Sequence, residues 1–123
     1  MFGGFDMELN AEALQSLASL RGERKFLEDD LYPGAPDEAT RVRCEVWANE
    51  LLDTLLNGLP SNPNSSYVLS QFVTHLERFE EDDTEERERA CGYCEQIMGI
   101  LSIESSQGIL DRWLYGFDPG EEP

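Results

Sequence analysis

The sequence is short of basic residues. Lysine and arginine together number 9 against 26 aspartates and glutamates, which gives a formal net charge of -17. Phosphate backbones and anionic membrane surfaces recruit Lys and Arg, so this shortage argues against direct nucleic-acid binding and against attachment to a membrane surface. An acidic surface steers encounters toward basic proteins, and it also keeps a small protein soluble.

Residues that carry chemistry are also few. The sequence has one histidine, His75, and three cysteines, an odd number that suits a reducing compartment better than a disulfide scaffold. With a single histidine and no nucleophile elbow around any serine, a Ser-His-Asp triad is unsupported. We therefore expect no catalytic residues.

Cys91 and Cys94 have the Cys-x-x-Cys spacing of thioredoxin-like redox pairs. That chemistry needs a strand before the first cysteine, whereas a helical run of Glu and Arg precedes it here. The distant Cys44 and His75 do not complete the ligand spacing of a structural zinc site. We predict that both cysteines are small core or boundary residues of a helix, and that the protein has no cofactor and no metal.

Long apolar runs and targeting segments are missing as well. The first ten residues contain neither a basic nor an apolar segment, and no later stretch approaches the roughly 18 apolar residues of a membrane span. We expect a cytoplasmic protein without a membrane span. The length of 123 residues suits one domain over residues 1–123, with flexible ends at 1–7 and 117–123.

What the sequence does contain is apolar spacing of α-helical period, and no alternating pattern long enough to build a sheet. Helix start and stop signals divide the chain into five segments. These run from the cap Asn10 to Lys25, from the cap Asp37 to Asn57-Gly58, from about Ser66 to Phe79, from the cap Asp83 to Leu101, and from a Ser105 or Ser106 cap to Tyr115-Gly116. The predicted fold is all-α, a compact bundle of about five helices, two of them short.

Several packing expectations follow from this division. The second helix should bury a broad apolar face that includes Val42 and Val46. The turn-rich loop from Phe26 to Pro36 should fold its apolar residues back onto the core, namely Phe26, Leu31 and Tyr32. Gly92 and Gly99 lie seven apart in the fourth helix, so we expect a neighbouring helix to approach closely there.

The densest charge of the chain runs from Glu80 to Arg89. Much of it suits a helix start, because Asp83 is a good cap, Glu86 stands three positions later, and the helix dipole favours acids in the first turn. The block therefore has two interpretations, a solvated helix start or a docking surface for a basic partner. The candidate partner-binding residues are Glu81, Asp82, Asp83, Glu85, Glu86 and Glu88.

Carboxylates three residues apart offer an enzymatic alternative. Such pairs on adjacent helices can hold Mg²⁺ for hydrolysis of nucleoside triphosphates, as in the all-α pyrophosphohydrolases. The candidate pairs are Glu50 with Asp53, Glu77 with Glu80, and Glu85 with Glu88. Their order and spacing do not match the pattern of that family, and pairs of this kind arise by chance in so acidic a chain.

A resemblance rests on Lys25-Phe26, Tyr32-Pro33-Gly34, the Asp83–Glu88 block, Tyr93, Ile97-Met98 and Trp113–Gly116. On these residues the chain resembles a family of short uncharacterised bacterial proteins, a domain of unknown function, over about residues 25 to 116. The resemblance implies a bacterial, helical, cytoplasmic protein and supplies no catalytic residues. In size, charge and lack of catalytic groups, the chain is also similar to acidic bacterial immunity proteins.

These observations favour a non-enzymatic binding protein. The leading hypothesis is an immunity or antitoxin-like inhibitor whose acidic surface occludes a basic toxin or effector domain. One alternative is the Mg-dependent hydrolase. Another is a secretion chaperone or adaptor, which would form a dimer on an extended segment of its client.

Overall fold

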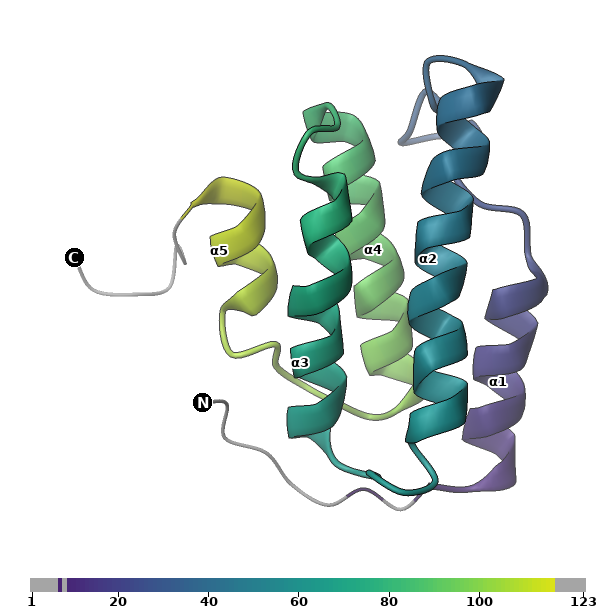
Figure 1. Ribbon diagram of the computed structural model, residues 1–123, viewed down its shortest axis with the longest axis vertical. Helices are drawn as coiled ribbons and strands as arrows, with labels where there is room; N and C mark the ends of the chain where they lie inside the picture. The colour runs from purple at the N-terminus through teal and green to yellow at the C-terminus, as the bar shows by residue number, and fades with distance from the viewer. Residues whose placement is uncertain (1–6, 8, 117–123) are drawn as a thin grey trace.

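The computed structural model describes residue 7 and residues 9–116, which form five α-helices and one 3-10 turn and contain no strand. The elements are α1 (Ala11–Gly22), α2 (Glu38–Gly58), α3 (Ser65–Leu76), η1 (Glu77–Phe79), α4 (Thr84–Ile100) and α5 (Ile109–Tyr115). Helices α1 to α4 run alternately up and down side by side, and the short α5 packs beside α3 and α4 (Figure 1). The predicted all-α bundle is confirmed. The expected flexible ends lie almost entirely outside the described residues.

Side-chain caps start the first three helices. Asn10 accepts a hydrogen bond from the Ala13 amide at 2.8 Å, and Asp37 accepts one from the Thr40 amide at 2.7 Å, both at the predicted positions. Helix α3 begins at Ser65, capped by Asn64, one residue before the predicted start. These bonds satisfy amides that have no partner inside a helix.

The last two helix starts differ from the prediction. Asp83 precedes α4, but its side chain makes no capping bond, and Glu86 is turned into the protein instead of back to the helix start. Helix α5 follows Gly108, which has a positive φ of 80°, and is not capped by Ser105 or Ser106. The chain enters α5 through this left-handed residue, a conformation that glycine adopts without strain.

The core lies between the four long helices and under the loop that joins α1 to α2. Phe26 and Tyr32 fold back onto it as predicted, whereas Leu31 at the turn is 97% exposed. Val42 and Val46 are also exposed, contrary to the prediction. Helix α2 buries the side that carries Cys44, Leu51 and Leu55, so its apolar stripe is wider than the face that its neighbours cover.

The glycines that limit helix packing are not the predicted ones. A Cβ added to Gly92 or Gly99 would meet nothing within 4 Å, so no neighbouring helix lies against them. The close approach occurs at Gly58, where an added Cβ would collide with the phenol of Tyr67. Tyr67 also donates a hydrogen bond to the Thr54 carbonyl of α2, so α3 is held against the end of α2 at this point.

Candidate functional site

The α3–α4 turn is the most acidic part of the bundle surface. It lies at the end of the molecule where α2 begins and where the α1–α2 loop passes (Figure 1). The exposed carboxylates of the turn and of the first α4 turns are Glu80, Glu81, Asp83, Glu85 and Glu88. None of them forms an ion pair with a described residue. We refer to these five residues as the acidic end.

Asp82 does not belong to this free charge. Its side chain is 8% exposed and pairs with Arg43 of α2 at 2.7 Å. The Arg43 guanidinium also lies over the Trp47 ring, 4.7 Å from its centroid. Asp82 therefore ties the turn to α2, which corrects its assignment as a free partner-binding carboxylate.

Glu86 is not a surface residue either. It is 2% exposed and accepts a hydrogen bond from the Tyr32 hydroxyl at 2.8 Å. Burial raises the pKa of Glu86, the bond from Tyr32 opposes this shift, and the charges of Asp83 and Glu85 add to it. A carboxylate enclosed in this way cannot contact a partner, so the prediction is wrong for Glu86.

Lys25 is the second charged group in the interior. Its amine donates to the carbonyls of Leu20, Arg21 and Glu23, at 2.5, 3.3 and 2.8 Å. Those carbonyls lie at the C-terminal end of α1, where a cation was predicted to interact favourably with the helix dipole. Lys25 makes this interaction in the interior of the protein and not on its surface. Burial lowers the pKa of Lys25.

The backbone around Lys25 is bound from two directions. Glu45 accepts from the Lys25 amide at 2.7 Å, and Arg41 donates to the Lys25 carbonyl at 3.2 Å. The next amide, that of Phe26, donates to the Tyr93 hydroxyl at 2.9 Å. Helices α2 and α4 thus hold the α1–α2 loop in place beside the acidic end.

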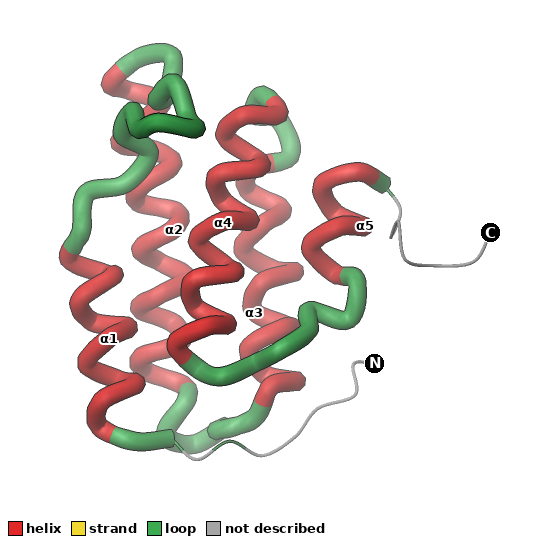
Figure 2. The backbone as a smooth tube through the Cα atoms, turned by 180° about the vertical axis from the view of Figure 1, so that it is seen from behind, coloured by secondary structure: helices red, strands yellow, loops and turns green. Residues whose placement is uncertain are grey.

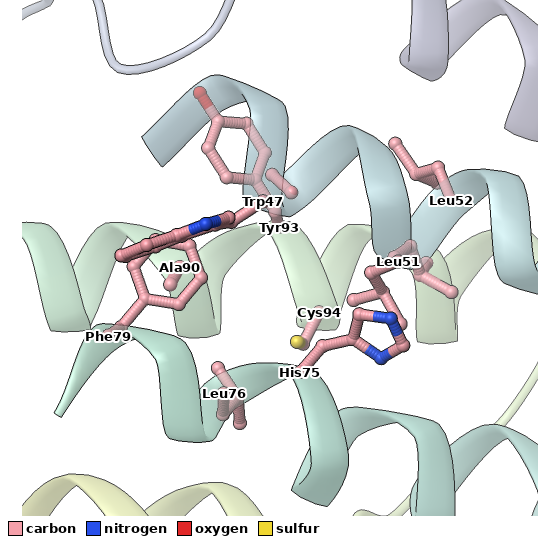
Figure 3. A pocket seen from close by; sticks show the side chains of 11 residues that line it. Trp47, Leu51, Leu52, His75, Leu76, Phe79, Ala90, Tyr93 and Cys94 are labelled. Atoms are coloured by element: carbon pink, nitrogen blue, oxygen red, sulfur yellow. The ribbon is translucent and has the colours of Figure 1, made fainter. Parts of the chain in front are cut away.

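An apolar pocket lies between α2, α3 and α4, lined by side chains that include Trp47, His75 and Cys94 (Figure 3). Its volume of about 10 Å³ is at the lower limit for one water molecule. His75 is bound within its own helix, with Nδ1 2.9 Å from the Gln71 carbonyl. The pocket therefore has no room for a substrate.

Cys91 and Cys94 lie in the core, one of the two placements that the sequence predicted, and Cys44 is buried as well. Cys44, Cys91 and Cys94 are buried free thiols. Burial raises the pKa of Cys44 and of Cys91 to about 12, and that of Cys94 well above its ordinary value. All three stay protonated at neutral pH and are poor nucleophiles.

The carboxylate pairs proposed for Mg²⁺ do not converge. Glu50 pairs with Arg78, and Asp53 pairs with Arg21 at 2.8 Å, so both α2 acids already have a cation. Within residue 7 and residues 9–116, no three side chains of His, Cys, Asp or Glu are placed to hold one metal ion. The same part of the chain has no helix that is long and apolar enough to cross a membrane.

A family model described as a domain of unknown function (DUF4844) matches residues 8–118. The chain belongs to the DUF4844 family. Membership confirms the resemblance to a domain of unknown function. Among the residues that carried the resemblance, Lys25, Phe26, Tyr32, Glu86 and Tyr93 all take part in the interior hydrogen bonds described above.

One solved structure similar to this DUF4844 chain is a DUF3571 family protein from Acinetobacter baumannii AYE. The two chains are 26% identical, with a TM-score of 0.76 over 85% of this chain and 89% of that one. No curated protein matches the DUF4844 chain.

Sequence reasoning missed the interior placement of Lys25 and Glu86, and it did not foresee that Tyr32, which was predicted to reach the core, donates a hydrogen bond to Glu86 there. A charged residue beside apolar ones, as in Lys25-Phe26, was the only available signal. It does not say whether the charge or its neighbour turns inward.

Proposed function

We propose that this protein is a non-enzymatic binding protein whose acidic end contacts a basic partner protein. The observation that carries the proposal is a difference in burial and pairing among the carboxylates that were predicted to bind a partner. Asp82 and Glu86 are held by partners within the protein, whereas Glu81, Asp83 and Glu85 are exposed and form no ion pair with a described residue. The turn between α3 and α4 and the first turn of α4 thus carry several unpaired carboxylates close together in the chain.

The ion pairs of the arginines support this interpretation, because they engage carboxylates that do not belong to the acidic end. Arg43 is the one that reaches the turn, and it pairs with Asp82. The other ion pairs are Arg21 with Asp53, Arg41 with Glu38 and Glu45, Arg78 with Glu50, and Arg89 with Asp29. The potential at the acidic end is therefore strongly negative, which speeds encounter with a basic surface and repels acidic ones.

The specific form that we propose is an inhibitor of a basic toxin or effector domain. Such an inhibitor acts by occupying the partner's basic surface, and it needs a rigid scaffold more than chemistry of its own. Asp82 and Tyr32 fix the turn from two sides through bonds to Arg43 and Glu86, so its charges are held in place before an encounter. Preorganisation of this kind reduces the entropy lost on binding.

The test compares two double variants of equal charge on a partner captured from the native host and identified by mass spectrometry. Glu81→Lys/Glu85→Lys reverses two charges of the acidic end, and Glu12→Lys/Glu23→Lys reverses one exposed acid in the first turn of α1 and one directly after that helix. We expect the first variant to raise Kd by about tenfold or more and to flatten its dependence on NaCl. The α1 variant should bind like the wild type.

Equal effects of the two variants would overturn the assignment, since they would show that only total charge matters. Helix content by circular dichroism serves as the folding control for both. A dimer bound to an extended client segment would favour the chaperone or adaptor alternative, and turnover of nucleoside triphosphates with Mg²⁺ would favour the hydrolase.

A further inference from the structure

In Figure 2, α4 lies toward the viewer with α5 beside it. A groove between these two helices is lined by residues of α4, of α5 and of the loop that joins them. It consists of two adjoining hollows of about 310 and 570 Å³, which share Glu95, Leu110 and Asp111. The first hollow is lined by Gly92 and the second by Gly99. The groove thus follows α4 from one glycine to the other.

On this face of α4, Glu88 and Glu95 also line the groove, and the two glycines are the positions that carry no side chain. The glycines are seven residues apart, which corresponds to about 10.5 Å along the helix and to nearly the same face. Glycine inside a helix is unfavourable relative to alanine, and helices usually compensate by close packing at that point. Here nothing lies within 4 Å of either position, so no described part of the chain supplies that packing.

The rim of the groove is acidic. Glu88, Glu95, Glu104 and Asp111 line the two hollows, are exposed, and form no ion pair with a described residue. Glu88, Glu95 and Asp111 line the first hollow together with Cys91, so the three carboxylates surround one stretch of the groove.

The basic residues near the groove have other contacts. Arg87 donates to the Trp113 carbonyl at 2.9 Å, and its guanidinium lies over the ring of the same residue. Arg112 donates to the Gln107 carbonyl at 3.4 Å. The described contacts of Arg87 are thus with Trp113 and Leu114, and not with a carboxylate of the rim.

The walls of the groove are partly apolar. Leu110 and Met98 are buried, Leu114 is half-buried, and Tyr115 is 55% exposed at the open end. An acidic rim around a strip of glycine and aliphatic side chains complements a helix with small or apolar residues on one face and cations beside them.

We propose that the α4–α5 groove binds a basic amphipathic helix of a partner protein. The apolar face of that helix lies over Gly92 and Gly99, and its Lys or Arg side chains meet the acidic rim. Charge complementarity selects this occupant. A second copy of the chain brings a net charge of -17, and residues 117–123 carry three acids and no base, so neither complements the rim.

The inference shares with the proposed function the class of partner, a basic protein, and it uses a second surface that meets the acidic end at Glu88. The probe is a synthetic helical peptide of about 16 residues built from Leu and Lys in an amphipathic order. A lysine-rich peptide of the same charge without leucine is its control. Binding is followed by fluorescence anisotropy and by amide chemical shifts of the labelled protein.

The decisive variant is Gly92→Leu/Gly99→Leu, which fills the groove without a clash because both positions are open. Its matched control is Gly22→Leu, at an equally open glycine that ends α1. We expect the double variant to be at least as stable as the wild type, because leucine has a higher helix propensity than glycine, and to bind the amphipathic peptide about tenfold or more weakly, whereas the control binds normally. Shift changes should concentrate on α4 and α5.

Three outcomes would overturn the proposal. They are equal binding by the double variant, equal binding of the lysine-rich peptide, and shift changes confined to the acidic end. The Glu81→Lys/Glu85→Lys variant separates the two surfaces, since it should retain the groove affinity for the peptide. If the peptide did not bind in the groove, the proposed contact at the acidic end would not be contradicted. Loss of groove affinity in that variant would contradict the inference alone.

Discussion

Two buried charges show how strongly a residue's surroundings decide its role. Lys25 and Glu86 are 1% and 2% exposed, yet their positions in the sequence look like surface positions. Lys25 is stabilised by three carbonyl acceptors, whereas Glu86 has one hydroxyl donor, that of Tyr32. A buried charge with few partners is costly, so the glutamate is the less well compensated of the two.

The raised pKa of Glu86 makes the stability of the fold depend on pH. The folded state binds this proton more tightly than the unfolded state does. The group therefore favours folding most below the ordinary glutamate pKa of about 4.3, and it loses that contribution as the pH rises through the raised folded value. Glu86→Gln keeps an acceptor for Tyr32 without the charge. We expect it to be more stable than the wild type at pH 8, with a difference that shrinks toward pH 4.

Urea unfolding at several pH values measures this difference, and Glu81→Gln, at an exposed acid, is the control for the loss of one negative charge. A gap between Glu86→Gln and the wild type that does not change with pH would contradict the assignment of the buried proton to Glu86.

Lys25 is expected to stabilise the end of α1. Lys25→Met keeps most of the aliphatic volume but leaves the carbonyls of Leu20 and Glu23 without their donor. The free energy of unfolding should fall by about 1 to 3 kcal/mol, the range for buried polar groups that lose a partner. Arg24→Met, at the exposed neighbouring position, should change it by less than about 0.5 kcal/mol. Guanidinium titration of both variants checks the result.

At the scale of the helices, the space around each glycine shows whether a neighbouring element packs against that helix face. Gly58 lies against the Tyr67 phenol, whereas Gly92 and Gly99 face open space. The sequence alone does not distinguish these three glycines. A glycine on an exposed helix face and a glycine packed against a neighbouring element look the same in the apolar pattern. Whether a glycine position is crowded or open depends on the neighbouring element that the tertiary structure places against it.

Alanine substitutions should separate these glycines. Gly92→Ala and Gly99→Ala remove a helix-interior glycine without a clash, so each should raise the free energy of unfolding by about 0.5 to 1 kcal/mol. Gly58→Ala should lower it, because the new methyl group displaces Tyr67. Thermal unfolding followed by circular dichroism measures all three. A stabilised Gly58→Ala variant would contradict the close contact between α2 and α3.

For the molecule as a whole, excess negative charge opposes compactness. The ion pairs between described residues join five arginines to six carboxylates, in a sequence that has 26 acids and 9 basic residues. Repulsion among the remaining carboxylates is stronger in the folded state, where they are closer together, than in the unfolded chain. Screening of this repulsion by added salt should therefore stabilise the fold.

We expect the Tm to rise when NaCl increases from about 0.05 to 0.5 M, since the screening length falls from about 14 Å to about 4 Å. The Glu81→Lys/Glu85→Lys variant should gain less, because it starts with less repulsion. A Tm that falls with salt would show that the surface ion pairs outweigh the excess charge. Differential scanning calorimetry in a salt series decides between these results.

The sequence by itself determined the helical class, most helix ends and the burial of the cysteines. These depend on local rules, namely apolar spacing of helical period, capping at Asn10 and Asp37, and the preference of thiols for the core. Only the tertiary structure decided which acids are free, which glycines are crowded, and that the open groove lies between α4 and α5. Burial, ion pairing and empty space depend on what another segment places opposite, and Tyr32 meets Glu86 from a position 54 residues away in the chain.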